Sequence, residues 1–188
     1  VQASVMFDEV ERAAQVGDMA KLERASADIK ERFARTTFAS QAAALAAKSL
    51  YEAGKTEAAQ KELTWVSENG ADDAYKAMAR LRLAGVLLDT KAYDQALALL
   101  AGDFPAEHAG LVADRRGDVL LAQGKRPEAK AEFEKAYKAL GEDVDYRRLV
   151  EVKLASLGVD VSAAATPQAT PAAAAASVAS PAASKAAS

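Results

Sequence analysis

The chain has 188 residues, of which 51% are hydrophobic and 6% aromatic, and its formal net charge is −3. This weak negative charge argues against nucleic-acid binding, and the absence of cysteine excludes disulfides and thiolate metal sites. Abundant Ala, Leu, Glu and Lys is typical of close-packed helices. The longest uncharged run before the C-terminal tail, Thr36–Ala47, is far below the roughly 20 residues of a membrane span. Composition therefore predicts an all-α protein.

Apolar residues recur at helical spacing through residues 1–158, and turn-forming residues divide this stretch into paired helices. A last helix, Tyr146–Leu157, has no partner, and Asp145 is placed to cap its start. Its apolar side fits a helix that closes the end of a stack of pairs. In chain order the predicted pairs are Ala3–Val16 with Met19–Phe33, Ala39–Ala53 with Glu57–Glu68, Asp73–Asp89 with Tyr93–Ala101, and Glu107–Ala122 with Pro127–Leu140.

Three stretches of the chain can be aligned with one another at offsets of 37 and 33 residues. A period of about 34 residues is typical of tetratricopeptide helix–turn–helix repeats, whose function lies on the surface made by stacked repeats. The sequence thus predicts a tetratricopeptide-like α-solenoid of about four helix pairs plus a C-terminal capping helix. The aligned stretches are Ala47–Gly54–Ala59–Leu63–Val66, Ala84–Lys91–Ala96–Leu100–Asp103 and Gly117–Gly124–Ala129–Phe133–Ala136.

Two segments of different composition follow one another along the chain. Residues 1–158 form the predicted repeat domain, and residues 159–188 form an Ala/Ser/Pro-rich low-complexity tail. From Ser162 onward the only charge is Lys185, and we expect this tail to be a disordered or locally helical linker. Because the chain opens at Val1 rather than Met, we interpret it as a fragment or processed form whose targeting segment lies upstream.

The residues that suggest chemistry each have a structural explanation. Gly54–Lys55–Thr56 resembles the end of a phosphate-binding loop, but Ser49 replaces the first glycine and a helix precedes the loop. His108, the single histidine, has no Cys or second His with which to form a metal or catalytic site, and we expect it on the surface. Trp65 is expected to pack in the core or between repeats. The sequence predicts no catalytic, cofactor-binding or metal residues, and no enzyme.

The inner face of the predicted stack is the candidate binding site. The first helix of each pair lines that face in this repeat type, and its apolar strip flanked by acids fits an apolar peptide segment or a partner helix. This predicted groove consists of Lys48, Tyr51, Met78, Leu81, Leu88, Asp89, Leu111, Asp114, Asp118 and Leu121, with Gln41, Ala44, Glu52, Gly85 and Ala122 beside them.

Two other arrangements of the predicted groove are compatible with the sequence. The capping helix or the N-terminal pair could fold into it and fill it, because the stack contains so few repeats. Alternatively, Asp114 or Asp118 could pair internally with Arg80 or Arg82 on the preceding repeat. A groove that clamps a terminal carboxylate fits the sequence less well, since only one lysine and one glutamine line the predicted groove.

Five stretches, taken in order, resemble one protein family more specifically than the repeat pattern alone does. They are Phe38–Ala43, Glu62–Asn69, Ala79–Ala84, Tyr93–Leu97 and Arg116–Gly124. With them, residues 1–158 resemble the periplasmic part of the ancillary SecYEG translocon subunit family, the YfgM-like tetratricopeptide proteins. The chain departs from that family in two respects: it lacks the membrane span, although its first residues resemble the stretch that follows the span, and it carries the Ala/Pro tail.

The resemblance implies a location and a set of partners. Members are single-span inner-membrane proteins with a periplasmic repeat domain, linked to the SecYEG channel and to periplasmic chaperones. The chain would then be a non-catalytic protein–protein interaction scaffold, an accessory subunit that contacts the channel, chaperones or client polypeptides, with no cofactor and no nucleic acid. The alternatives are an envelope repeat protein that coordinates cell division or cell-wall synthesis complexes, and a purely structural oligomer.

Overall fold

The computed structural model describes residues 1–141 and 144–161, and within them it contains helices and no strands. The all-α prediction is confirmed, and the predicted helix bounds agree with the observed ones to within two residues. Residues 162–188, which make up most of the predicted tail, lie outside the described residues. The helices are α1 (Gln2–Val16), α2 (Met19–Phe33), α3 (Thr37–Glu52), α4 (Thr56–Asn69), α5 (Asp73–Asp89), α6 (Tyr93–Leu100), α7 (Ala109–Ala122), α8 (Arg126–Ala139) and α9 (Val144–Ser156).

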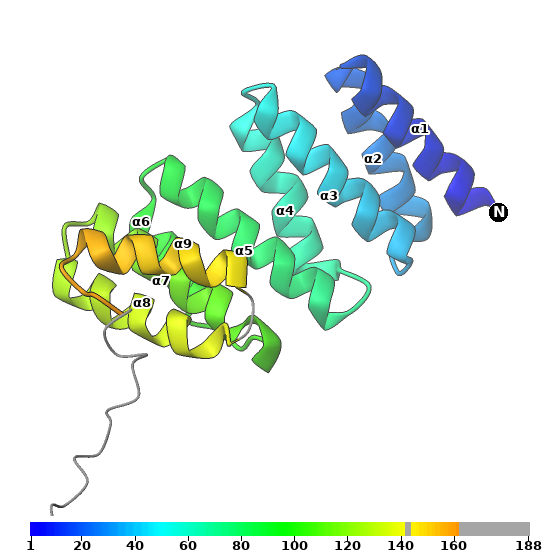
Figure 1. Ribbon diagram of the computed structural model, residues 1–188. Helices are drawn as coiled ribbons and strands as arrows, with labels where there is room; N and C mark the ends of the chain where they lie inside the picture. Colours follow the sequence, from blue (N-terminus) through cyan, green and yellow to red (C-terminus); the bar gives the residue numbers. More distant parts are fainter. Residues whose placement is uncertain (142–143, 162–188) are drawn as a thin grey trace, which may run out of the picture.

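The helices are stacked in a row from α1 at one end to α7, α8 and α9 at the other (Figure 1). Helices α1 and α2, α3 and α4, α5 and α6, and α7 and α8 form the pairs, and each second helix also packs on the first helix of the next pair. The last helix, α9, packs on α8, where the first helix of a fifth pair would lie. The described residues therefore form an α-solenoid of four helix pairs closed by one unpaired helix, as predicted.

The same kind of turn separates the two helices of each pair. Gly17, Gly54 and Gly124 have φ angles of 73°, 78° and 77°, in the left-handed region where a side chain is strained. Lys91 occupies the equivalent place in the third pair, with a φ of 61°. The repeated glycines are thus explained by the turns, and Gly54 belongs to an interhelix turn that follows a helix.

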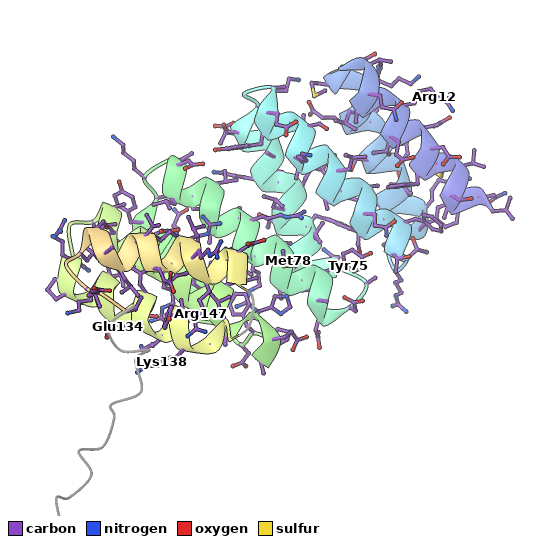
Figure 2. The ribbon with its side chains drawn as sticks, in the orientation of Figure 1. Arg12, Tyr75, Met78, Glu134, Lys138 and Arg147 are labelled. Carbon is purple, nitrogen blue, oxygen red and sulfur yellow. The ribbon has the colours of Figure 1, made fainter. Side chains whose placement is uncertain are left out.

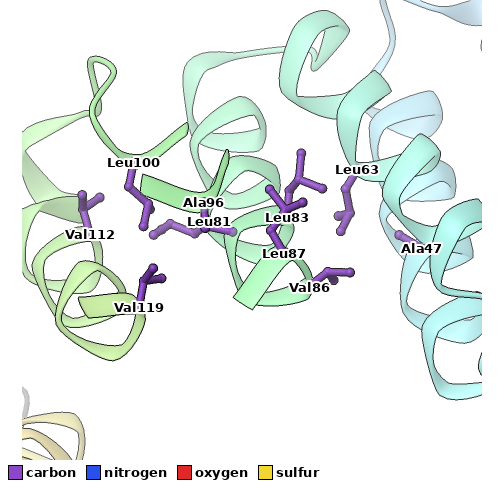
Figure 3. Close-up of a cluster of buried hydrophobic side chains, with 11 residues drawn as sticks. Ala47, Leu63, Leu81, Leu83, Val86, Leu87, Ala96, Leu100, Val112 and Val119 are labelled. Carbon is purple, nitrogen blue, oxygen red and sulfur yellow. The ribbon is translucent and has the colours of Figure 1, made fainter. Parts of the chain in front are cut away.

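Buried side chains link each pair to the next. Figure 3 shows the central cluster, in which the leucines of α5 lie between side chains of α3 and α4 on one side and of α6 and α7 on the other. The small residues of the sequence repeat allow this close approach: Ala47 and Ala84 are buried. A Cβ added at Gly117 would lie 2.5 Å from the Phe133 ring, so only glycine fits there without movement.

His108 is buried, which corrects the prediction of a surface position. It ends a 3₁₀ turn, Ala106–His108, that leads into α7, and the residue is 8% exposed. Its Nδ1 atom has no hydrogen-bond partner within residues 1–141 and 144–161. The irregular turn after Pro105 has no helical periodicity from which burial could be predicted. Trp65, in contrast, packs as predicted, half-buried against the core of the first two pairs.

Candidate protein-binding groove

A cavity of about 330 Å³ opens between α3 and α5. Ala44 of α3 and Met78 and Ala79 of α5 line it together with Leu63 and Val66 of α4, so much of its wall is apolar. Figure 2 labels Tyr75 and Met78, which lie one helical turn apart on α5. We call this cavity the α3–α5 pocket; its other lining residues are Gln41, Asp72, Ala74, Tyr75 and Arg82.

Side-chain hydrogen bonds join α3 and α5 across this region. The Nε2 atom of Gln41 donates to the hydroxyl of Tyr75 at 3.0 Å, and the hydroxyl of Tyr51 donates to the carboxylate of Asp89. The bond to Asp89 raises the pKa of Tyr51, because the carboxylate stabilises the protonated phenol. The two links tie neighbouring first helices together, while the small side chain of Ala44 leaves the space between them unfilled.

Cationic side chains accompany the α3–α5 pocket. Arg82 lines it, and Lys48 of α3 is exposed, with its Nζ atom 3.9 Å from Glu52. On the next helix pair, the guanidinium group of Arg115 lies 3.4 Å from the place where a Cβ on Gly85 would be. The absence of a side chain at Gly85 lets Arg115 lie against α5. Lys48 and Arg115 each lie near a carboxylate, since Arg115 is 4.0 Å from Asp118, so Arg82 is the cation of this set that lines the pocket itself.

The C-terminal end of the predicted groove is covered by α9. Lys153 of α9 donates hydrogen bonds to Asp114 at 2.7 Å and to Asp118 at 3.0 Å, and the hydroxyl of Tyr146 donates to Asp114 at 2.7 Å. Asp114 is only 3% exposed. The structure thus has the arrangement considered as an alternative above, with the capping helix filling this part of the groove.

Burial shifts the pKa of two side chains at this interface, Asp118 and Tyr146. It raises the pKa of Asp118 above its ordinary value, although the hydrogen bond from Lys153 acts in the opposite direction. Burial, reinforced by the hydrogen bond to Asp114, also raises the pKa of Tyr146. Tyr146 therefore remains a protonated hydrogen-bond donor at neutral pH.

The cation that pairs with these aspartates differs from the one considered in the sequence. Arg80 instead donates to the backbone carbonyls of Leu99 and Asp103, and its guanidinium group lies 3.9 Å from the centroid of the Phe104 ring. Helix α6 ends early, at Leu100, and Arg80 supplies a donor to one of its last carbonyls, that of Leu99, and to the carbonyl of Asp103 in the loop that follows. The internal pairing of Asp114 or Asp118 with Arg80 or Arg82 is therefore wrong.

The ten predicted groove residues differ widely in accessibility. Leu81 is 6% exposed and belongs to the central cluster, so it is a core residue rather than part of an open surface. Asp114 is buried under α9, as described above. For the others a protein-binding role stays a prediction: Lys48, Tyr51 and Asp89 are exposed, and Met78, Leu88, Leu111, Asp118 and Leu121 are half-buried.

Three residues that line the pocket, Tyr75, Ala79 and Arg82, were not among those that the sequence predicted for the binding face. A signal for Tyr75 was present, because it follows Gln41 by 34 residues, about one repeat, and so lies beside it on the next first helix. Ala79 had no comparable signal, since a small residue on a helix fits either a core or a groove.

Two further features of residues 1–141 and 144–161 bear on function. None of their helices is long and apolar enough to cross a membrane. Nor do they bring together three or more His, Asp or Glu side chains that could hold a metal ion.

Comparison with known proteins places the chain in a family. Residues 1–159 match the family model of the tetratricopeptide repeat-like domain. The chain is also 32% identical, over 155 residues, to the ancillary SecYEG translocon subunit of Neisseria gonorrhoeae, an alignment that covers 82% of this chain and 74% of the relative. Fold, family model and relative agree in indicating a protein-interaction role. The chain belongs to the tetratricopeptide repeat-like family and is a relative of the ancillary SecYEG translocon subunits.

Proposed function

We propose that the protein is a non-catalytic scaffold that acts as an accessory subunit of the SecYEG translocon. In this role it is the periplasmic domain of a bacterial inner-membrane protein, and it brings periplasmic chaperones or emerging polypeptides to the channel. The relative supports the link to the translocon, and the helical-repeat fold supports a role in binding rather than in chemistry.

The observation that carries the proposal is the open α3–α5 pocket. Its apolar wall lies on the first-helix face of the stack, where repeat proteins of this type offer a surface to partners. Burial of one large apolar side chain there would contribute about 1.5–3 kcal/mol to binding. The α7 end of the predicted groove is covered by α9, so binding through the groove is expected between α3 and α5.

Affinity purification from cells tests this proposal with the full-length protein in its own membrane. Ala44→Trp fills the pocket with an indole group, and Ala131→Trp adds the same group on the exposed face of α8. We expect the unmodified protein and Ala131→Trp to recover SecYEG together with a periplasmic chaperone or a secreted chain.

The Ala44→Trp variant should lose the chaperone or secreted chain while its melting temperature stays close to that of the parent. Equal recovery of the chaperone or secreted chain by the two tryptophan variants would exclude the pocket as the binding site. Recovery of division or cell-wall synthesis proteins in place of SecYEG would favour the alternative function.

A further inference from the structure

The charged side chains along the groove are, with few exceptions, engaged by neighbours. Lys48 lies beside Glu52, Asp89 accepts the hydroxyl of Tyr51, and Lys153 neutralises the aspartates of α7. Asp72, which also lines the pocket, accepts a hydrogen bond from the backbone N–H of Tyr75 at 2.9 Å and so caps α5. These charges are therefore satisfied within the fold.

Arg82 is different. It lines the α3–α5 pocket and is exposed, yet its guanidinium group makes no hydrogen bond, ion pair or ring contact with any residue in the described ranges 1–141 and 144–161. A guanidinium group presents donors in a planar fork that matches a carboxylate. The pocket thus combines an apolar wall with an available cation at its side.

We propose that the α3–α5 pocket binds a polypeptide segment in which a large apolar residue is followed or preceded by an acidic residue. The apolar side chain enters the cavity, and the carboxylate pairs with Arg82. This inference rests on the proposed function, because it names the chemistry of the partner at the same pocket.

Charge complementarity makes the pocket selective. An acidic residue beside Arg82 is attracted by its guanidinium group and a basic residue in its place is repelled, whereas Lys48 and Arg115 on the neighbouring first helices each lie near a carboxylate, Glu52 at 3.9 Å and Asp118 at 4.0 Å. An ion pair this exposed adds little affinity by itself. It discriminates between segments whose apolar residue already occupies the cavity.

A peptide array provides the test. The probes are 12-residue peptides in an Ala/Ser background with one central Leu or Phe, whose neighbouring positions carry Glu, Gln or Lys in turn. The full chain is applied to the array, and the affinities of the best peptides are then measured by fluorescence anisotropy. We expect Glu peptides to bind roughly tenfold tighter than Lys peptides, the order that electrostatic complementarity predicts.

Two charge-reversal variants isolate Arg82. Arg82→Glu should reverse the preference and favour Lys peptides, without a change in melting temperature, because Arg82 is exposed and makes no hydrogen bond, ion pair or ring contact with the described residues that the change would remove. Arg12→Glu makes the same change on the exposed surface of α1, at the other end of the molecule (Figure 2), and should preserve the preference for Glu.

The outcomes separate this inference from the proposed function. Peptide binding that Ala44→Trp abolishes, but that is indifferent to Glu or Lys and to Arg82→Glu, would overturn the acidic partner and leave the pocket as a binding site. Failure of every Leu and Phe peptide to bind would also overturn the proposed acidic peptide partner. The link to the translocon is decided separately, by affinity purification.

Discussion

Glu62 is a nearly buried carboxylate that is neutralised across the boundary between two helix pairs. It accepts hydrogen bonds from the hydroxyl of Ser26 at 2.9 Å and from the Nζ atom of Lys30 at 2.8 Å, both on α2. At the equivalent position of α8, Glu132 pairs with Lys135 of the same helix at 2.9 Å and with Arg116 of α7 at 3.8 Å. An unpaired carboxylate at such a position would be strongly destabilising, so these contacts fix how neighbouring helices align.

Gly117 offers the clearest test at the scale of one residue. Gly117→Leu should lower the free energy of unfolding by about 1–3 kcal/mol or more, because its side chain must displace the Phe133 ring. Urea denaturation followed by circular dichroism measures the change.

Gly85→Ala is the matched control. It also lies inside a helix, but its new Cβ would meet only the flexible end of Arg115 at 3.4 Å, and it should be neutral or stabilising. Equal stability of Gly117→Leu and the parent would contradict the packing described for α7 and α8.

Residue-scale prediction from the sequence succeeded where the repeat constrained the residue. The small residue at Gly117 and the turn at Gly54 follow from the repeat register, and both are confirmed. Leu81 was placed on the groove because the repeat gives the face of a helix only approximately. On α5 the apolar residues extend around much of the helix, which packs against α4, α6 and α7, so the pattern did not separate core from groove.

At the scale of elements, α6 and α9 differ most from a regular repeat. Helix α6 has 8 residues, against 14 or 15 for the other second helices, and Arg80 donates a hydrogen bond to the carbonyl of Leu99 in its last turn. The sequence predicted where α6 begins and ends but not the side chain that completes its end. That contact joins residues from two helices, and helical spacing carries no information about it.

The α7–α9 interface predicts a dependence of stability on pH. Since burial raises the pKa of Asp118 above 3.8, the folded protein binds this proton more tightly than the unfolded chain does. Protonation of Asp118 as the pH falls therefore stabilises the folded protein. Ionisation of Asp118 as the pH rises toward neutral removes that stabilisation. Asp118→Asn should thus be no less stable than the parent at about pH 7, and should lose its relative advantage toward about pH 4.

Asp114→Asn is the comparison for this interface. It weakens the acceptor for both Lys153 and Tyr146 at a site that is 3% exposed, and it should cost about 1–3 kcal/mol at neutral pH. Chemical denaturation at several pH values would measure both variants. An equal loss of stability for Asp118→Asn and Asp114→Asn at neutral pH would show that burial does not dominate at Asp118.

At the scale of the whole molecule, the stack has a closed end and an open middle. Helix α9 packs on α8 and engages the acids of α7, so the last pair offers no free groove there. Between α3 and α5 the helices are linked by two hydrogen bonds and leave the α3–α5 pocket accessible. The solenoid and its cap could be predicted from the sequence, because both depend on periodicity.

The division of the groove into a part covered by α9 and an open part between α3 and α5 could not be predicted from periodicity. It depends on how far α3 and α5 separate, which is set by packing on α4, and on which side chain of α9 meets Asp114. Both features depend on contacts between residues that are far apart in the sequence.

Site-specific photocrosslinking in living cells tests the central claim most directly. A photoreactive amino acid replaces Ala44 inside the α3–α5 pocket or, as control, Ala131 on the exposed face of α8. We predict that position 44 forms adducts with a SecYEG subunit, a periplasmic chaperone or a polypeptide in transit, and that position 131 does not. The same adducts from both positions, or none from position 44, would contradict the assignment of the pocket as the binding site.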